Sequence, residues 1–356
     1  MDLMKRAGDL KGELSEYAKS PRFQRATRNM ILRAFPNGVD NEMIFSTALD
    51  AFVFTERLEG GQTVLGSFAE RFTGADRALL LSWADYVQGV FEIKEPYGED
   101  GVVAVNHVDE LTYRIRSNIG AEGVEQLTPG VIMVGGIVPV GDDWMISGAA
   151  TAYSAEDADM VLAGVRTLQL QNPKMVFRNP DKLAQARVIQ AEQRASFIDL
   201  YGGDLVVVGG DAVKETMLAF YRHHHERGGG EAAEWQEPEL PDLGFAGVSS
   251  VAIVFDADEG LSFFPSFDLA QAVFADPSLI VRRPYRDVVS GYLRGGDTGP
   301  GILRRLAATD PAKADEVFRR LLKKPGFSWD RDGEALLRKH KPTWFDGPVL
   351  PRMIPV

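Results

Sequence analysis

The hydrophobic period of this chain changes at Gly89 and changes back at Ser154, and this switch limits the folds open to it. Between these residues the apolar positions fall into short runs, such as Thr112–Arg116, in which polar and apolar side chains alternate. Alternation with a period of two is typical of half-buried strands. Residues 89–153 therefore predict about five short strands, which suit a small antiparallel β-barrel of the SH3-like or OB-like kind.

Glycines mark two features of this strand region. The turn Gly141-Asp142-Asp143 is expected to close a hairpin onto Trp144–Gly148. Gly135 and Gly136 lie inside a long β-rich run, where glycine favours a bulge or a barrel corner.

Helices are predicted on both sides of the strands, which makes the fold class α+β. Apolar side chains recur there at helical spacing, as they do over residues 44–52. Cap residues predict where these helices begin: Asp40, Thr73–Asp76, Ser154–Asp157, Asn179-Pro180 and Asp310-Pro311.

The C-terminal half adds strands to the helical pattern. A short strand is expected at Asp204–Val208, and Val248–Phe255 with Leu261–Phe264 is typical of a hairpin. Three consecutive glycines and two prolines indicate a linker before it. The predicted division is a helical domain over 1–88, a β-barrel over 89–153, a mainly helical part with one strand over 154–227, a linker over 228–244 and a mixed α/β C-terminal domain over 245–356.

Composition restricts the chemistry. The chain has 356 residues and no cysteine, so disulfides, thiolate zinc sites and cysteine nucleophiles are excluded. No run approaches the ~18 apolar residues of a membrane span, and the first residues lack the apolar core of a signal peptide. We expect a cytoplasmic protein without a membrane partner, a metal or a cofactor.

The charge of the chain is unevenly distributed. The net charge is −12, yet residues 282–341 hold 15 Lys/Arg against 8 Asp/Glu, a local +7 that leaves −19 for the rest. The predicted barrel region, in contrast, has 3 basic and 10 acidic residues. A nucleic-acid contact therefore fits the C-terminal region better than the barrel. The alternative is that the basic residues form solvated helix faces.

A glycine-rich segment, Gly295–Gly301, leads into one of the C-terminal helices. Backbone amides at such a helix start can bind phosphate. However, no strand leads into the segment and no Gly-Lys-Ser/Thr ends it, which favours a turn or a flexible linker over a P-loop. If an anion site exists, its predicted residues are Arg282, Arg283, Arg286 and Arg294.

Three further motifs have simpler interpretations. His223–His225 are consecutive, and because helical neighbours point ~100° apart they are expected to lie on the surface and not on one metal. Asp256–Gly260 begins like a calcium loop, but Phe267 stands where the bidentate glutamate belongs, which favours a hairpin turn. His107 lies near Asp109 and Glu110, either as acid–base machinery or on a solvated turn.

Several stretches are similar to a family of uncharacterised bacterial proteins, some of which carry an SEC-C zinc motif. They are Trp83–Glu92, Thr112–Arg116, Leu127–Gly130, Val138–Gly148, Val251–Phe274 and Phe327–Trp329. The resemblance implies no known activity. Because this chain has no cysteine, it lacks the zinc motif itself.

Three functions stay open. The first is a non-enzymatic protein-binding or scaffold module that recognises a protein partner, which the modular layout and the lack of a familiar catalytic motif favour. The second is an enzyme that uses Asp/Glu and Arg at strand ends after Gly202. The third is a nucleic-acid-binding protein that uses the basic C-terminal region, with Tyr285, Tyr292 and Trp329 for stacking.

Overall fold

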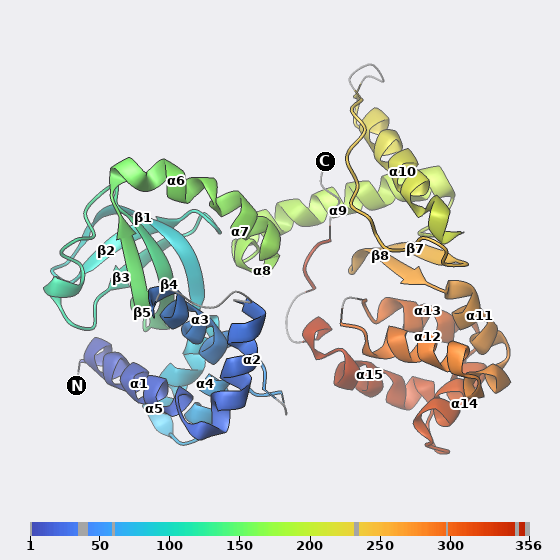
Figure 1. The fold of residues 1–356 in the computed structure, drawn as a ribbon, viewed down its shortest axis with the longest axis horizontal. Coiled ribbons are helices and arrows are strands. Elements are labelled where there is room, and N and C mark those ends of the chain that lie inside the picture. Colours follow the sequence, from blue (N-terminus) through green and yellow to red (C-terminus); the bar gives the residue numbers. More distant parts are fainter. Residues whose placement is uncertain are drawn as a thin grey trace. The chain divides into compact units, whose positions relative to one another are not determined.

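The computed structural model describes residues 2–34, 42–58, 61–230, 235–296, 298–345 and 349–352. They fall into two compact units, an N-terminal unit, Met1–Asn179, and a C-terminal unit, Pro180–Val356. Each unit combines helices with one sheet (Figure 1), and the α+β class is confirmed. The finer five-part division stays a prediction.

The described residues ahead of the barrel are mainly helical, as expected: α1 (Leu3–Ala18), α2 (Gln24–Ala34), α3 (Glu42–Thr55), α4 (Val64–Ala69) and α5 (Gly74–Ser82). The predicted cap Asp40 lies outside the described residues. Thr73 precedes α5, but its hydroxyl makes no capping bond. Asp76 instead accepts a 2.6 Å hydrogen bond from Arg6 of α1, so its carboxylate joins two helices.

Five strands close into a barrel: β1 (Val87–Tyr97), β2 (Gly101–Asn106), β3 (Thr112–Arg116), β4 (Ile132–Val140) and β5 (Asp143–Tyr153). Their order is β1-β2-β3-β5-β4, and β1 pairs with β4 to complete the ring. All neighbours are antiparallel except β3 and β5. The β-barrel predicted for residues 89–153 is confirmed as a closed ring of five strands.

The glycine pair in β4 forms the expected bulge. The register with β5 shifts between Val134 and Gly136. A Cβ atom at position 136 would lie 2.3 Å from the hydroxyl oxygen of Tyr86, so only glycine fits there. The bulge bends β4 at the point where side chains of the strand begin to pack into two different cores.

Those cores are the barrel interior and the layer of helices outside it. Phe91, Tyr113 and Met133 pack inside the barrel. Val138 and Met145 pack against the buried side chains of the N-terminal helices. After the barrel, α6 (Ala158–Ala163), α7 (Val165–Gln171) and α8 (Pro173–Val176) cover another face of the strands.

The C-terminal unit is built on a three-stranded antiparallel sheet in the order β6-β7-β8. Its first part contains α9 (Pro180–Tyr201), β6 (Leu205–Val208), α10 (Val213–Arg227), β7 (Val251–Asp256) and β8 (Gly260–Pro265). The helix predicted to open at Asn179-Pro180 and the hairpin of β7 and β8 are confirmed. Residues 235–250 have no helix or strand, and Leu240 and Phe245 pack against the core beside α10.

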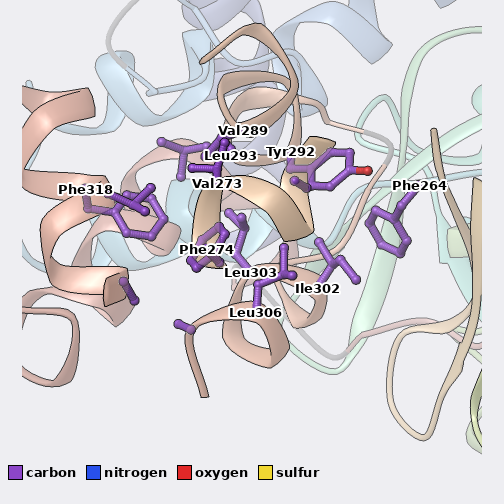
Figure 2. Close-up of a cluster of buried hydrophobic side chains, with 14 of the residues drawn as sticks. Phe264, Val273, Phe274, Val289, Tyr292, Leu293, Ile302, Leu303, Leu306 and Phe318 are labelled. Carbon is purple, nitrogen blue, oxygen red and sulfur yellow. The ribbon is translucent and has the colours of Figure 1, made fainter. Parts of the chain in front are cut away.

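Alternate residues of β7 face different helices. Val251, Ile253 and Phe255 pack against α9 and α10. Ala252 and Val254 point to the opposite core, which Figure 2 shows around Phe274 and Leu303. That second core is formed by α11 (Phe267–Ala275), α12 (Arg283–Arg294), α13 (Gly301–Thr309), α14 (Pro311–Leu322) and α15 (Trp329–His340). Asp310 caps α14 as predicted, because its carboxylate accepts the Lys313 amide at 3.1 Å.

Candidate docking grooves

A groove of about 470 Å³ opens on the barrel, between residues 96–102 and residues 121–129. We call it the barrel groove. The side chains of Val102 and Leu127 are buried in the barrel core and form its floor together with Val124. Its rim carries Glu99 and, from the segment between β3 and β4, Glu122 and Glu125. The groove therefore combines an apolar floor with an acidic rim.

The three rim glutamates are exposed, and none forms an ion pair with a described residue. No lysine or arginine lines the groove. The basic residues of the barrel are instead matched to other acids: Lys94 to Glu92, Arg114 to Asp143 and Arg116 to Asp100. The Arg116 guanidinium holds the pKa of Asp100 below its ordinary value. Uncompensated negative charge therefore gathers at the groove and disfavours phosphate there.

A second groove, of about 790 Å³, lies between the end of α14 and the face of α15 in the C-terminal unit. We call it the lysine groove. Its apolar lining includes Leu322, Phe327 and Leu336, and the last two are almost fully buried. Its charged lining is mainly basic: Lys323, Lys324 and Lys339, with Asp332 as the one acid. The imidazole of His340 also lines it.

The acid in this groove is already engaged. Asp332 accepts hydrogen bonds from Arg331 at 2.8 Å and from the Ser328 amide at 3.0 Å. The Arg331 bond lowers the pKa of Asp332 to about 2. The pKa of His340 lies below its ordinary value, because burial disfavours the imidazolium and the neighbouring Arg294 and Lys339 repel it. The neutral form of His340 is therefore favoured, and the positive charge of this groove comes from its three lysines.

The four arginines predicted for an anion site are not gathered together. Arg282, Arg283 and Arg286 are exposed at the start of α12, whereas Arg294 lies at its end. The separation along the helix is roughly 18 Å, from twelve residues at about 1.5 Å each. Arg294 belongs instead to the surroundings of His340, so the structure divides the predicted set between two places.

Side chains from elsewhere in the C-terminal unit hold the described residues of the glycine-rich segment before α13 in place. The buried Lys341 ammonium donates hydrogen bonds to the carbonyls of Gly295 and Thr298, at 2.7 and 2.6 Å. At the helix start, the Gly301 amide donates to the Glu259 carboxylate at 2.7 Å. A Cβ atom on Gly299 would lie 1.9 Å from that carboxylate. The Glu259 side chain therefore occupies the start of α13, where a bound phosphate would accept hydrogen bonds from the backbone amides.

Glu259 comes from the β7–β8 hairpin, where sequence favoured a plain polar turn. The hairpin turn is confirmed, but this carboxylate is 6% exposed. Burial raises the pKa of Glu259 to about 7. Its partner lies 42 positions along the chain, and no local pattern marks that pairing.

The histidine motifs resolve into separate contacts. His223 contacts the Asp199 carboxylate and His224 the Ser196 hydroxyl, each at 2.9 Å. Across the part of the chain that the structure describes, no three His, Asp or Glu side chains are placed to share an ion. His107 lies on the turn after β2 and contacts Glu92 at 2.9 Å.

The buried acid of that turn stabilises the backbone. Asp109 accepts hydrogen bonds from the Tyr113 hydroxyl at 2.6 Å and the Leu111 amide at 2.9 Å. Burial raises the pKa of Asp109. Gln169 of α7 donates to the carbonyl of Val108 in the same turn. The group therefore joins the barrel to the helices after it.

Two polar clusters escaped sequence reasoning because their members are far apart in the chain. Asp50, buried between the N-terminal helices and β5, accepts hydrogen bonds from Lys11 and Ser147, both at 2.8 Å. In the C-terminal unit, Asp204 accepts bonds from Arg194 and Arg305 at 3.0 and 2.9 Å. The second cluster has the composition that an enzyme was expected to use at a strand end, but it lines neither groove.

The aromatic residues considered for nucleic-acid stacking belong largely to the core. Tyr292 is 5% exposed and donates its hydroxyl to the Pro265 carbonyl. Trp329 stacks on Phe318, with ring centroids 4.7 Å apart. Tyr285 packs against the same core.

Comparison with known proteins assigns no family, since no family model, curated protein or solved structure matches this chain. The resemblance to SEC-C-associated bacterial proteins stays a prediction. Among the described helices, none combines the length and apolar character that crossing a bilayer requires.

Proposed function

We propose that this chain is a non-enzymatic protein-binding module whose barrel groove receives a partner segment rich in lysine or arginine. The observation that carries the proposal is the groove itself, in which three glutamates without an ion-pair partner among the described residues surround a floor of Val102 and Leu127. An apolar centre within a polar rim is the usual anatomy of a protein interface. The acidic rim favours a cationic partner and speeds its approach.

The geometry supports this function better than the two alternatives. Of the sites described above, the Asp204 cluster comes nearest to an enzyme's needs, and its charges are satisfied by two arginines outside either groove. The barrel offers nucleic acid the wrong sign of charge. A cytoplasmic setting is part of the proposal, and fractionation of the native host's cells tests it.

The function is tested by capture from lysate of the native host with quantitative mass spectrometry. The bait is compared with the variant Glu99→Gln, Glu122→Gln, Glu125→Gln. A control variant changes the same charge at exposed positions elsewhere in the N-terminal unit: Asp9→Asn, Glu156→Gln, Asp159→Asn. We expect a partner with a basic segment that the groove variant loses at least about tenfold and the control retains.

A purified partner must then reproduce this order of affinities in a titration with the full chain. Equal recovery by all three baits would contradict the proposal. So would catalytic turnover by the pure protein that depends on the Asp204 cluster.

A further inference from the structure

The rim of the lysine groove carries basic side chains that no acidic residue matches in the described part of the chain. Two arginines nearby have acidic partners: Arg319 contacts Asp315 at 2.8 Å, and Arg304 contacts Glu334 at 2.6 Å. Lys323, Lys324 and Lys339 are exposed and form no ion pair with any residue that the structure describes. Positive charge without an ion-pair partner therefore lines this groove's rim. The same holds at the start of α12, where the exposed Arg282 and Arg286 form no ion pair with a described residue.

The backbone holds two of these lysines in fixed positions. Lys323 ends α14 with φ of 55°, a left-handed conformation that favours glycine. The Lys324 amide donates to the Arg319 carbonyl at 3.0 Å, which completes the helix end. Lys339 approaches from α15 on the other side of the groove. Charges from two elements thus border one apolar floor.

We propose that the lysine groove is a second docking site, and that it takes an acidic peptide segment with an apolar anchor. Leu322, Phe327 and Leu336 offer the anchor an apolar surface. The three lysines would contact carboxylates beside it. This site is independent of the barrel groove, and its partner has the opposite charge.

The same charges could attract nucleic acid, but the surroundings favour a peptide. Binding of single strands relies on exposed aromatic rings as well as on positive charge. Here Trp329 stacks on Phe318, and Phe327 is 5% exposed within the core. Three lysines around an apolar floor without an exposed aromatic ring fit a short acidic peptide better than a strand of phosphates.

The test uses the full chain and a fluorescein-labelled twelve-residue peptide with the repeat Glu-Glu-Leu, followed by anisotropy at low salt. The groove variant is Lys323→Gln, Lys324→Gln, Lys339→Gln. A control with the same change in charge alters the start of α12: Arg282→Gln, Arg283→Gln, Arg286→Gln. We expect at least tenfold weaker binding for the groove variant and less than twofold change for the control.

A second variant keeps the charge, Lys323→Arg, Lys324→Arg, Lys339→Arg, and is expected to bind within about threefold of the parent chain. Circular dichroism checks that each variant is folded. If the glutamine variant unfolds, the affinity of the arginine variant is the test of the proposal. A parent chain that does not bind the peptide would overturn the proposal. Equal losses in the groove and α12 variants would also overturn it, as would tighter binding of a twelve-nucleotide single strand through the same lysines.

Discussion

The barrel groove and the lysine groove share one plan and carry opposite charges. Each has a floor made by side chains of a hydrophobic core and a rim of three exposed charges without ion-pair partners among the described residues. In the barrel, neighbouring acids neutralise Arg114 and Arg116 and leave the rim glutamates uncompensated. In the C-terminal unit, Arg319 and Arg304 neutralise Asp315 and Glu334, and the three groove lysines have no acidic partner among the described residues. Net charge therefore says less about partners than local pairing does.

The largest effect on binding should come from reversing the charge of the barrel rim. In the variant Glu99→Lys, Glu122→Lys, Glu125→Lys, a peptide with the repeat Lys-Lys-Leu should bind about 100-fold more weakly at low salt. The Glu-Glu-Leu peptide should gain binding to the N-terminal unit. Anisotropy titrations measure both changes, and reversal at Asp9, Glu156 and Asp159 is the control. If the control loses as much affinity, net charge and not the groove governs binding.

The next effect concerns a carboxylate that is buried and not exposed on a rim. Glu259 has a pKa of about 7 in the folded chain, above its ordinary value of 4.5. The folded protein therefore holds a proton that the unfolded chain has lost, so rising pH destabilises it between about 4.5 and 7. The full cost at pH 8 is about 3 kcal/mol. Glu259→Gln should match the parent chain near pH 4.5 and exceed its free energy of unfolding at pH 8.

Urea unfolding across this pH range measures the difference. Glu334→Gln is a control of opposite sign, because the Arg304 bond lowers the pKa of Glu334. The stabilisation from Glu334 is present at high pH and is lost as pH falls. The free energy of unfolding of Glu334→Gln should therefore lie further below that of the parent chain at pH 8 than at low pH. Parallel profiles for the parent chain and Glu259→Gln would show that the carboxylate is not buried at the start of α13.

The smallest effect separates charge from apolar contact in both grooves. Raising salt from 50 to 500 mM shortens the screening length from about 14 to about 4 Å. Each peptide should then bind its groove roughly fivefold more weakly, because the rim charges are exposed. The glutamine variants of each rim should show a flatter salt dependence in the same titrations. Salt-independent binding would assign the affinity to the floors alone.

The fold was predictable where neighbouring residues determine the structure. The alternation at Thr112–Arg116 and the cap Asp310 act over a few positions, and both appear as expected. The bulge at Gly136 was also predictable from the sequence, because glycine inside a strand usually marks a bulge or a bend. These features depend on local backbone preferences, so a short stretch of sequence is enough to predict them.

The sites were less predictable because distant segments form them. The barrel groove joins a hairpin turn to a segment more than twenty residues away, and Glu259 meets Gly301 across 42 positions. The arginine set failed to gather because position along a helix separates Arg283 from Arg294. Of the four arginines, only Arg294 lies near the lysine groove. The sequence feature that pointed to this region was its excess of lysine and arginine.

Hydrogen exchange with each peptide bound to the full chain tests the central claim most directly. We expect the Lys-Lys-Leu peptide to slow amide exchange at residues 96–102 and 121–129, and the Glu-Glu-Leu peptide to slow it at residues 322–327 and 335–340. Protection of one common segment by both peptides, or protection confined to surfaces outside these ranges, would contradict the existence of two charge-selective grooves.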